Sequence, residues 1–207
     1  MEYLNTYFLM RHGESGANAA GIIASAPEMA LENFGLTSKG REESGESVLE
    51  FSEGKSIDLI YSSDFKRALE TAAIAANIFG VEEVHSTYLL RDRFFGELDG
   101  GDDSRYEMVW ERDLEDPDHC YFGVESVREV GERALEFLFR CENEYSGKDI
   151  LVVSHGDVLQ ILFCAANGIP VRRHRSLEPM GKADIRPLLD HGLRNFHGFN
   201  GCINGNS

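Results

Sequence analysis

The sequence is sparing with cysteine and contains no C-x-x-C pair. Its thiols belong to Cys120, Cys141, Cys164 and Cys202, and Cys164 lies in an apolar, helix-like stretch where a thiol acts as a small hydrophobic group. The chain also lacks an apolar run of membrane-spanning length, a basic-then-apolar leader and any asparagine followed two residues later by serine or threonine. We therefore expect a cytoplasmic protein with reduced cysteines and no membrane association.

Basic residues are scarce as well. The sequence has 20 lysines and arginines against 36 aspartates and glutamates, a formal net charge of −16. This charge repels nucleic acids and anionic lipid surfaces, so we expect neither as a partner. A nucleotide-binding P-loop is also missing, because Gly54-Lys55-Ser56 resembles its end but Leu49 occupies the position of the required glycine. Any anion that binds must be held by a local basic pocket.

Short apolar runs and helical patterns alternate along the 207 residues, of which 42% are hydrophobic. Strands are predicted at residues 7–10, 59–61 and 150–153, with a last edge strand within 182–188. Helices are predicted at residues 37–51, 65–79, 126–145 and 158–166, the last three closed by Gly80, Gly147 and Gly168. The alternation predicts an α/β fold, a three-layer sandwich whose mostly parallel central sheet is flanked by helices.

The composition indicates a single domain over residues 1–191, in which about 92–125 form an insertion or cap over the site. The charges and the single Trp110 of residues 99–124 are typical of an irregular or helical insertion. Its acidic residues are expected to be solvated surface; they include Asp102, Asp103, Asp116 and Asp118. Residues 192–207 are rich in glycine and asparagine, which is typical of a loosely held C-terminal tail.

Arginine and histidine follow three of the predicted strands. Arg11-His12-Gly13 follows the first strand, Arg67 lies in the first turn of the helix after the second, and His155-Gly156-Asp157 follows residues 150–153. Ligands of such sheets bind beyond the carboxyl ends of the strands. Alone, Arg67 fits a helix-face charge and His155 a capping histidine, but clustered cations repel one another unless an anion neutralises them. The planar guanidinium of arginine presents donors that match phosphate oxygens. A helix that begins at Gly156 would add backbone N–H groups and the positive end of its dipole, so these residues suit a phosphoryl group.

The sequence resembles the histidine phosphatase superfamily, which has the phosphoglycerate mutase-like fold. The resemblance covers most of the chain and rests on motifs in the family's order: "RHGES" at 11–15 followed by Asn18, "GLTSKG" at 35–40, "SSDFKRALETA" at 62–72, "LLRDRFFGELDG" at 89–100 and "VSHGDVLQIL" at 153–162. It implies a transfer that needs no metal or cofactor, in which His12 attacks phosphorus, forms a phosphohistidine and is released by water.

The resemblance also assigns roles around that histidine. Arg11, Arg67 and His155 are expected to stabilise charge on the phosphoryl oxygens. Gly13 is expected to bring backbone N–H groups close to the substrate, and Asn18 to donate a secondary hydrogen bond.

The proton donor is where this chain departs from the family pattern. The usual donor is a glutamate at the position of Asp92, whose side chain is shorter by about 1.5 Å. We favour Asp92 on alignment, with Glu97, five residues further on, as the alternative acid.

Two features favour a phosphatase acting on a small phosphorylated substrate. The stretch from Asp92 to His155 is short beside that of the mutases, and Ala17 stands where the mutase motif has tryptophan. The alternatives are a phosphoglycerate mutase, a non-catalytic phosphate- or protein-binding relative, and a metallohydrolase with His12, His155 and Asp157 as ligands.

Overall fold

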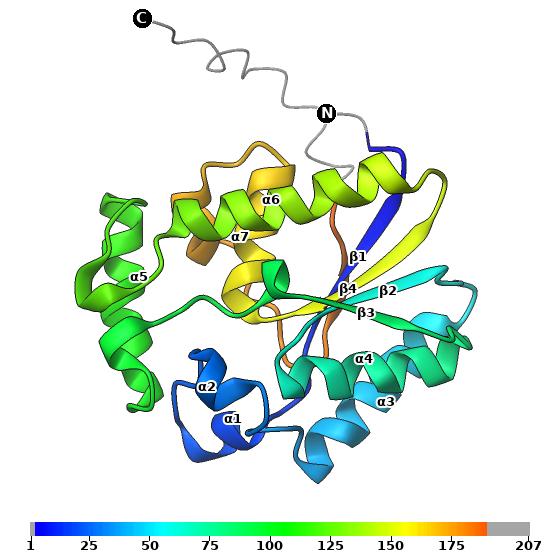
Figure 1. Ribbon diagram of the computed structural model, residues 1–207, viewed down its shortest axis with the longest axis horizontal. Helices are drawn as coiled ribbons and strands as arrows, with labels where there is room; N and C mark the ends of the chain where they lie inside the picture. The colour runs from blue at the N-terminus through cyan, green and yellow to red at the C-terminus, as the bar shows by residue number, and fades with distance from the viewer. Residues whose placement is uncertain (1–2, 190–207) are drawn as a thin grey trace, which may run out of the picture.

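A computed structural model describes residues 3–189, and its centre is a five-stranded sheet in the order β3-β2-β4-β1-β5 (Figure 1). The strands are β1 (Thr6–Arg11), β2 (Leu59–Ser63), β3 (Val84–Thr87), β4 (Asp149–Ser154) and β5 (Ile185–Pro187). The first four are parallel, and β5 runs antiparallel beside β1. The predicted mostly parallel sheet and its last edge strand are therefore confirmed. The predicted tail, 192–207, lies outside the described residues.

The hydrophobic core lies on both faces of the sheet, as the unbroken apolar runs predict. Side chains alternate along β1, so that Tyr7 and Leu9 pack on one face and Phe8 and Met10 on the other. Helices α6 (Val127–Glu144) and α7 (Gly156–Ala166) cover the first face, and α3 (Ser38–Ser52) and α4 (Lys66–Phe79) cover the second (Figure 1). The predicted three-layer α/β sandwich is confirmed.

Local sequence signals set the helix ends. The Thr37 hydroxyl accepts a hydrogen bond from the Gly40 N–H and caps α3, and Ser126 and Glu129 form a capping box at the start of α6. Helix α7 begins at Gly156, as the phosphate-binding argument expected, two residues before the helical pattern read from residue 158. Helix α6 ends at Glu144, within one residue of its predicted end.

Strand β3 was missed by the sequence analysis. It is a four-residue edge strand, Val84-His85-Ser86-Thr87, paired only with β2, and none of its residues is fully buried. An edge strand with so little apolar surface leaves no continuous hydrophobic run in the sequence.

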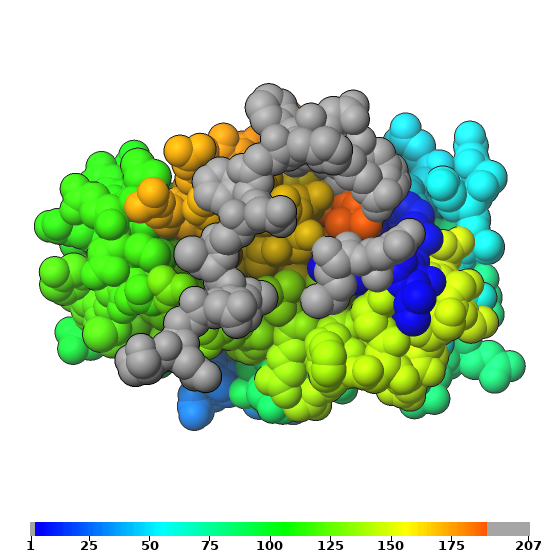
Figure 2. Space-filling model, turned by 90° about the horizontal axis from the view of Figure 1, so that it is seen from above, coloured from blue at the N-terminus to red at the C-terminus, as the bar shows by residue number. Residues whose placement is uncertain are grey.

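We call residues 92–125 the cap segment. The short elements outside the layers are α1 (Gly16–Ala20), α2 (Pro27–Ala30), η1 (Tyr88–Leu90), η2 (Gly96–Leu98), η3 (Asp103–Arg105), α5 (Tyr106–Glu115), η4 (Tyr121–Gly123) and η5 (Val171–Ser176). Figure 2 shows the cap segment in green at one end of the molecule, beside η5 in orange. Within residues 3–189, no helix combines the length and apolarity needed to cross a bilayer.

A buried ion pair within the cap segment joins its first residues to helix α5. The Arg93 guanidinium donates to both carboxylate oxygens of Asp113 at 2.7 and 2.8 Å, and neither side chain is more than 1% exposed. The His119 ring bonds the same carboxylate at 2.8 Å. Removing one partner would leave an uncompensated buried charge, so this network holds α5 in one position.

Two glycines of α3 give a matched test of how the helix packs on the loop after β1. A Cβ at Gly40 would overlap the backbone of Glu14, whereas a Cβ at Gly45 would meet nothing within 4 Å. We expect Gly40→Ala to lower the free energy of unfolding by about 1–3 kcal/mol. Gly45→Ala is expected to raise it by up to about 1 kcal/mol, since alanine is the better helix former. Urea unfolding measures both, and equal effects would contradict this packing.

Candidate active site

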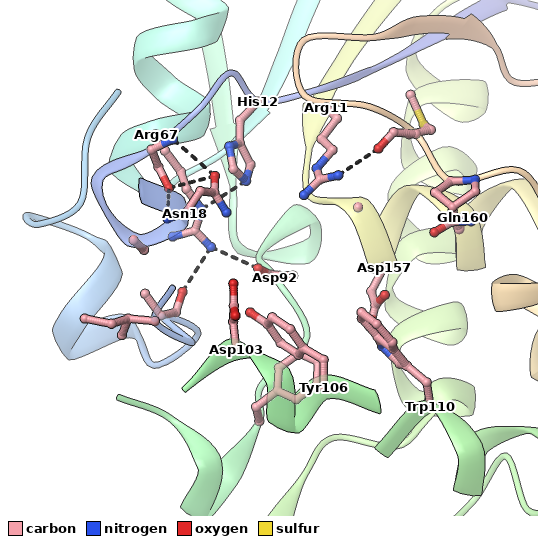
Figure 3. Close-up of a pocket in the computed structure, with 18 of the residues that line it drawn as sticks. Arg11, His12, Asn18, Arg67, Asp92, Asp103, Tyr106, Trp110, Asp157 and Gln160 are labelled. Carbon is pink, nitrogen blue, oxygen red and sulfur yellow. Dashed lines mark hydrogen bonds and ion pairs between the residues drawn. The ribbon is translucent and has the colours of Figure 1, made fainter. Parts of the chain in front are cut away.

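The strand register brings the predicted site residues to one edge of the sheet. Arg11 pairs with Ser154 across β1 and β4, and Ser62 pairs with Val153 across β2 and β4, so the three carboxyl ends are level. A cavity of about 330 Å³ opens there (Figure 3). Its lining includes Arg11, His12, Ala17, Asn18, Arg67, Asp92 and Gly156 from the predicted set, together with Asp103, Tyr106, Trp110, Asp157, Gln160 and Arg175.

His12 is held in one orientation by hydrogen bonds to both ring nitrogens. Its Nδ1 lies 2.7 Å from the Gly13 carbonyl oxygen, which can only accept, so Nδ1 carries the proton. Its Nε2 then accepts a hydrogen bond of 3.2 Å from Nε of Arg67. Burial, together with Arg67 and then Arg11, holds the pKa of His12 well below its usual value. The ring is therefore neutral, and its Nε2 lone pair can act as a nucleophile once the hydrogen bond from Arg67 is released.

Arg67 is buried beside this nitrogen, so the interpretation of it as a helix-face charge is wrong. Its Nη2 donates to the Ala24 carbonyl at 3.0 Å and to Oδ2 of Asp92 at 2.9 Å. Its Nη1 is buried and makes no hydrogen bond with the part of the chain that is described. Arg67 lies in the first turn of α4, which follows β2 directly. This position places its guanidinium at the carboxyl edge of the sheet.

Arg11 presents a second guanidinium to the cavity. Its Nη1 donates to the Met180 carbonyl at 2.7 Å, and its Nε is buried without a hydrogen bond among residues 3–189. Gly156, the first residue of α7, lies under this guanidinium, where a Cβ would come within 3.4 Å of Nε. The two arginines and the N-terminus of α7 give this end of the cavity a positive potential.

His155 lies behind the cavity rather than on its surface. It is fully buried, its ring centroid is 5.1 Å from that of His12, and its Nε2 is hydrogen-bonded to Oγ of Ser63 at 2.9 Å. Its Nδ1 makes no hydrogen bond within the described chain and is 3.5 Å from Oδ2 of Asp92. Burial, and next to it Arg67, lowers the pKa of His155 well below its usual value. A neutral imidazole thus separates His12 from the core.

The structure separates the two candidate acids. Asp92 lines the cavity and its side chain is 15% exposed, whereas Glu97 is exposed and does not line the cavity. Burial raises the pKa of Asp92 above its usual value, although the neighbouring Arg67 opposes the shift. A raised pKa favours the protonated carboxyl that a general acid requires.

Arg133, which the sequence analysis missed, holds the backbone that carries Asp92. Its guanidinium donates to the carbonyl oxygens of Leu89 at 2.8 Å and of Asp92 at 3.2 Å, and it is paired with Glu125 at 2.7 Å. It lies on α6, far from every recognised motif, and only the fold brings it to this loop.

The expectation for Gly13 is wrong. Its N–H donates to Oγ1 of Thr71 at 3.2 Å, and the residue does not line the cavity. The position excludes a side chain because a Cβ would overlap the Gly40 carbonyl and the Ser44 hydroxyl of α3. Close packing explains this glycine. Asn18 does line the cavity, while its Oδ1 accepts from the Ser15 N–H at 3.1 Å and closes the capping box of α1.

The far wall of the cavity comes from the cap segment and η5. The Trp110 indole donates to Oδ2 of Asp157 at 2.9 Å, and the Arg175 guanidinium lies 3.6 Å over the indole ring. Arg175 also donates to Oδ1 of Asp157 at 3.2 Å, so both oxygens of this carboxylate are engaged. In the sequence, only Trp110, the single tryptophan, indicated that this charged segment contributes to a site.

The comparisons with known proteins agree with this geometry. The sequence profile of the histidine phosphatase superfamily (branch 1) matches residues 7–189, and the chain belongs to this superfamily. It is 30% identical over 175 residues to the metal-independent phosphoserine phosphatase of Arabidopsis thaliana, covering 75% of this chain and 66% of that protein. It is also 30% identical over 168 residues to the phosphoglycerate mutase-like protein 4 of the same plant, covering 75% of this chain and 68% of that protein.

A solved structure supports the fold independently. A mycobacterial glucosyl-3-phosphoglycerate phosphatase in complex with VO3 superposes with a TM-score of 0.75 at 20% identity, covering 88% of this chain and 91% of that one. The predicted phosphoglycerate mutase-like fold is confirmed.

Arg67→Lys tests the buried guanidinium. A lysine ammonium cannot bond His12, Ala24 and Asp92 and also present a free fork to a phosphoryl group. We expect kcat/KM for a phosphomonoester to fall by roughly 30- to 1000-fold, the loss of about 2–4 kcal/mol of transition-state stabilisation. The control is Arg41→Lys, the same change at a side chain 51% exposed that pairs with Glu70, which should leave kcat/KM unchanged. Equal activities in the two variants would contradict a clamping role.

Proposed function

We propose that this protein is a metal-independent phosphatase that hydrolyses a small phosphomonoester through a phosphohistidine on His12. The phosphatase names among its relatives support this function, including the metal-independent phosphoserine phosphatase. In this proposal, residues 1–191 act as a single domain and the cap segment covers the site.

One observation carries the proposal. Nε of Arg11 and Nη1 of Arg67 are buried donors without a hydrogen bond in the described chain, and they lie beside the neutral His12. Buried polar groups are rarely left unpaired, because each costs about 1–3 kcal/mol. A tetrahedral dianion is the ligand that two guanidinium groups and a helix N-terminus fit best.

The first chemical step transfers the phosphoryl group to the enzyme. The Nε2 lone pair of His12 forms the N–P bond while the ester P–O bond breaks, and Asp92 gives its proton to the departing alkoxide, which leaves as an alcohol. Arg11 and Arg67 stabilise the charge on the equatorial oxygens, so the charge stabilisation comes from side chains.

The second step regenerates the enzyme. A water molecule attacks the phosphorus of the phosphohistidine, and the Asp92 carboxylate takes the proton that the water loses. The N–P bond breaks, its electron pair returns to Nε2 of His12, and inorganic phosphate leaves. His155, whose Nδ1 is buried without a hydrogen bond in the described chain, is proposed to stabilise charge on the phosphoryl oxygens together with the two arginines.

Water is favoured over a second phosphate ester as the acceptor. Ala17 lines the cavity where the mutase motif has tryptophan, and the chain from Asp92 to His155 is short, which leaves less protein to exclude water. Phosphoglycerate mutase activity is the alternative, favoured by the mutase-like name of one plant relative.

We further propose a reducing, cytoplasmic setting. The three cysteines of residues 3–189 are free thiols, and burial raises the pKa of Cys141 to about 12 and of Cys164 to about 11. Buried thiols of this kind are inert hydrophobic groups.

A comparison of kcat/KM for substrates with different leaving groups tests both the phosphatase function and the identity of the general acid. Wild-type protein in EDTA should release phosphate from both propyl phosphate and p-nitrophenyl phosphate. Asp92→Asn should lower kcat/KM for propyl phosphate by roughly 10²- to 10⁴-fold, because its basic alkoxide needs a proton. The p-nitrophenolate leaves without much help, so its rate should fall by less than about tenfold.

The matched control is Glu97→Gln, the same loss of a carboxylate at the exposed alternative position, which should leave both rates unchanged. A leaving-group-dependent loss in Glu97→Gln with none in Asp92→Asn would assign the acid to Glu97. Isomerisation of 3-phosphoglycerate with a bisphosphate primer, in place of phosphate release, would establish the mutase alternative.

A further inference from the structure

The charged side chains that line the cavity form two paired groups, one around His12 and one on the far wall. Around the nucleophile, Arg11 and Arg67 face the phosphoryl position, with Asp92 bonded to Arg67. On the far wall, Arg175 is neutralised by Asp157 at 3.2 Å and also donates to Oε1 of Gln160 at 2.9 Å. Neither of these two groups presents a free negative charge to a substrate.

Asp103 is different from these paired groups. It lines the cavity, and its carboxylate makes no hydrogen bond or ion pair with any residue between 3 and 189. Figure 3 shows this carboxylate beside the Tyr106 side chain, both directed into the cavity. The main-chain N–H of Asp103 donates to the Gly21 carbonyl at 2.9 Å and fixes the residue at this place. Asp103 is an exposed residue, as the sequence analysis expected, and it also lines the cavity.

Tyr106 completes an acceptor group next to this carboxylate. Its ring is stacked on Trp110 at 5.2 Å and packs edge-on against Phe95 at 4.6 Å, so the side chain is held firmly. The hydroxyl makes no hydrogen bond within the described part of the chain, which leaves its oxygen as an acceptor. Two carboxylate oxygens and one phenol oxygen match the three donors of a primary ammonium group.

We propose, on the basis of the phosphatase function above, that the preferred substrate is a phosphomonoester whose alcohol carries a cationic ammonium group. Asp103 and Tyr106 bind the ammonium while Arg11 and Arg67 hold the phosphate. The substrate thus presents one charge of each sign to the side chains that line the cavity. A second anionic group on the alcohol is disfavoured, since Asp103 repels it and Asp157 already neutralises the arginine on that wall.

Three esters of similar size provide the test: 2-aminoethyl phosphate, its neutral isostere propyl phosphate, and anionic 2-carboxyethyl phosphate. We expect kcat/KM to follow the order cationic, neutral, anionic. The preference for the cationic over the neutral ester should be roughly tenfold, the combined size of a partly screened ion pair and an ammonium–aromatic contact. High salt should reduce this preference, because the ion pair is open to solvent.

Asp103→Asn removes the charge and keeps the shape of the side chain. The ratio of kcat/KM for the cationic ester to that for the neutral ester should fall from roughly ten to about one. The matched control is Glu107→Gln, the same change on the exposed side of the cap segment outside this cavity, which should keep the wild-type ratio.

The outcomes separate this proposal from the function on which it rests. Equal rates for the cationic and neutral esters, a preference for the anionic ester, or an unchanged ratio in Asp103→Asn would overturn the ammonium site and leave the phosphatase standing. Failure to hydrolyse any of the three esters would overturn the proposed function itself.

Discussion

The site depends on one hydrogen bond, from Nε of Arg67 to Nε2 of His12, in a place that water scarcely reaches. A charged imidazole could not accept this bond and would be repelled by the guanidinium, so the contact keeps the histidine neutral. The Gly13 carbonyl acts on the opposite nitrogen and fixes the tautomer. Because Arg67 also bonds Asp92, the same guanidinium sets the positions of the proposed nucleophile and the proposed acid. In the proposed mechanism, His12 attacks without first losing a proton, and Arg67, which together with burial keeps the ring neutral, also faces the phosphoryl group.

The surrounding structure keeps these groups in register. The parallel pairing of β1 and β4 sets His12 against His155, and the first turn of α4 delivers Arg67. The loop that carries Asp92 is fixed separately, because Arg133 donates hydrogen bonds to the carbonyl oxygens of Leu89 and Asp92. The buried pair of Arg93 with Asp113 then joins that loop to helix α5. A change in the cap segment can therefore reach the acid without touching the substrate.

The sequence predicted the layers, four of the five strands and most of the phosphate-binding end of the cavity, because these follow from short-range patterns. Apolar runs mark doubly covered strands, and the residues that follow a parallel strand must lie at the sheet edge. Strand β3 escaped because a short edge strand with little apolar surface carries little pattern. Gly13 was misread because its need for close packing arises from α3, which no local motif reveals. Arg133, Tyr106 and Asp103 depend on contacts between distant segments, so only the folded chain brings them to the site.

The central claim is that Nε2 of His12 is the covalent nucleophile. Rapid quenching during turnover of a phosphomonoester, followed by peptide mapping, tests it most directly. The account predicts a phosphate that is stable to base, labile to acid and located on His12, and it predicts no such label in His12→Ala. Turnover without a labelled histidine, or full activity in His12→Ala, would contradict the account.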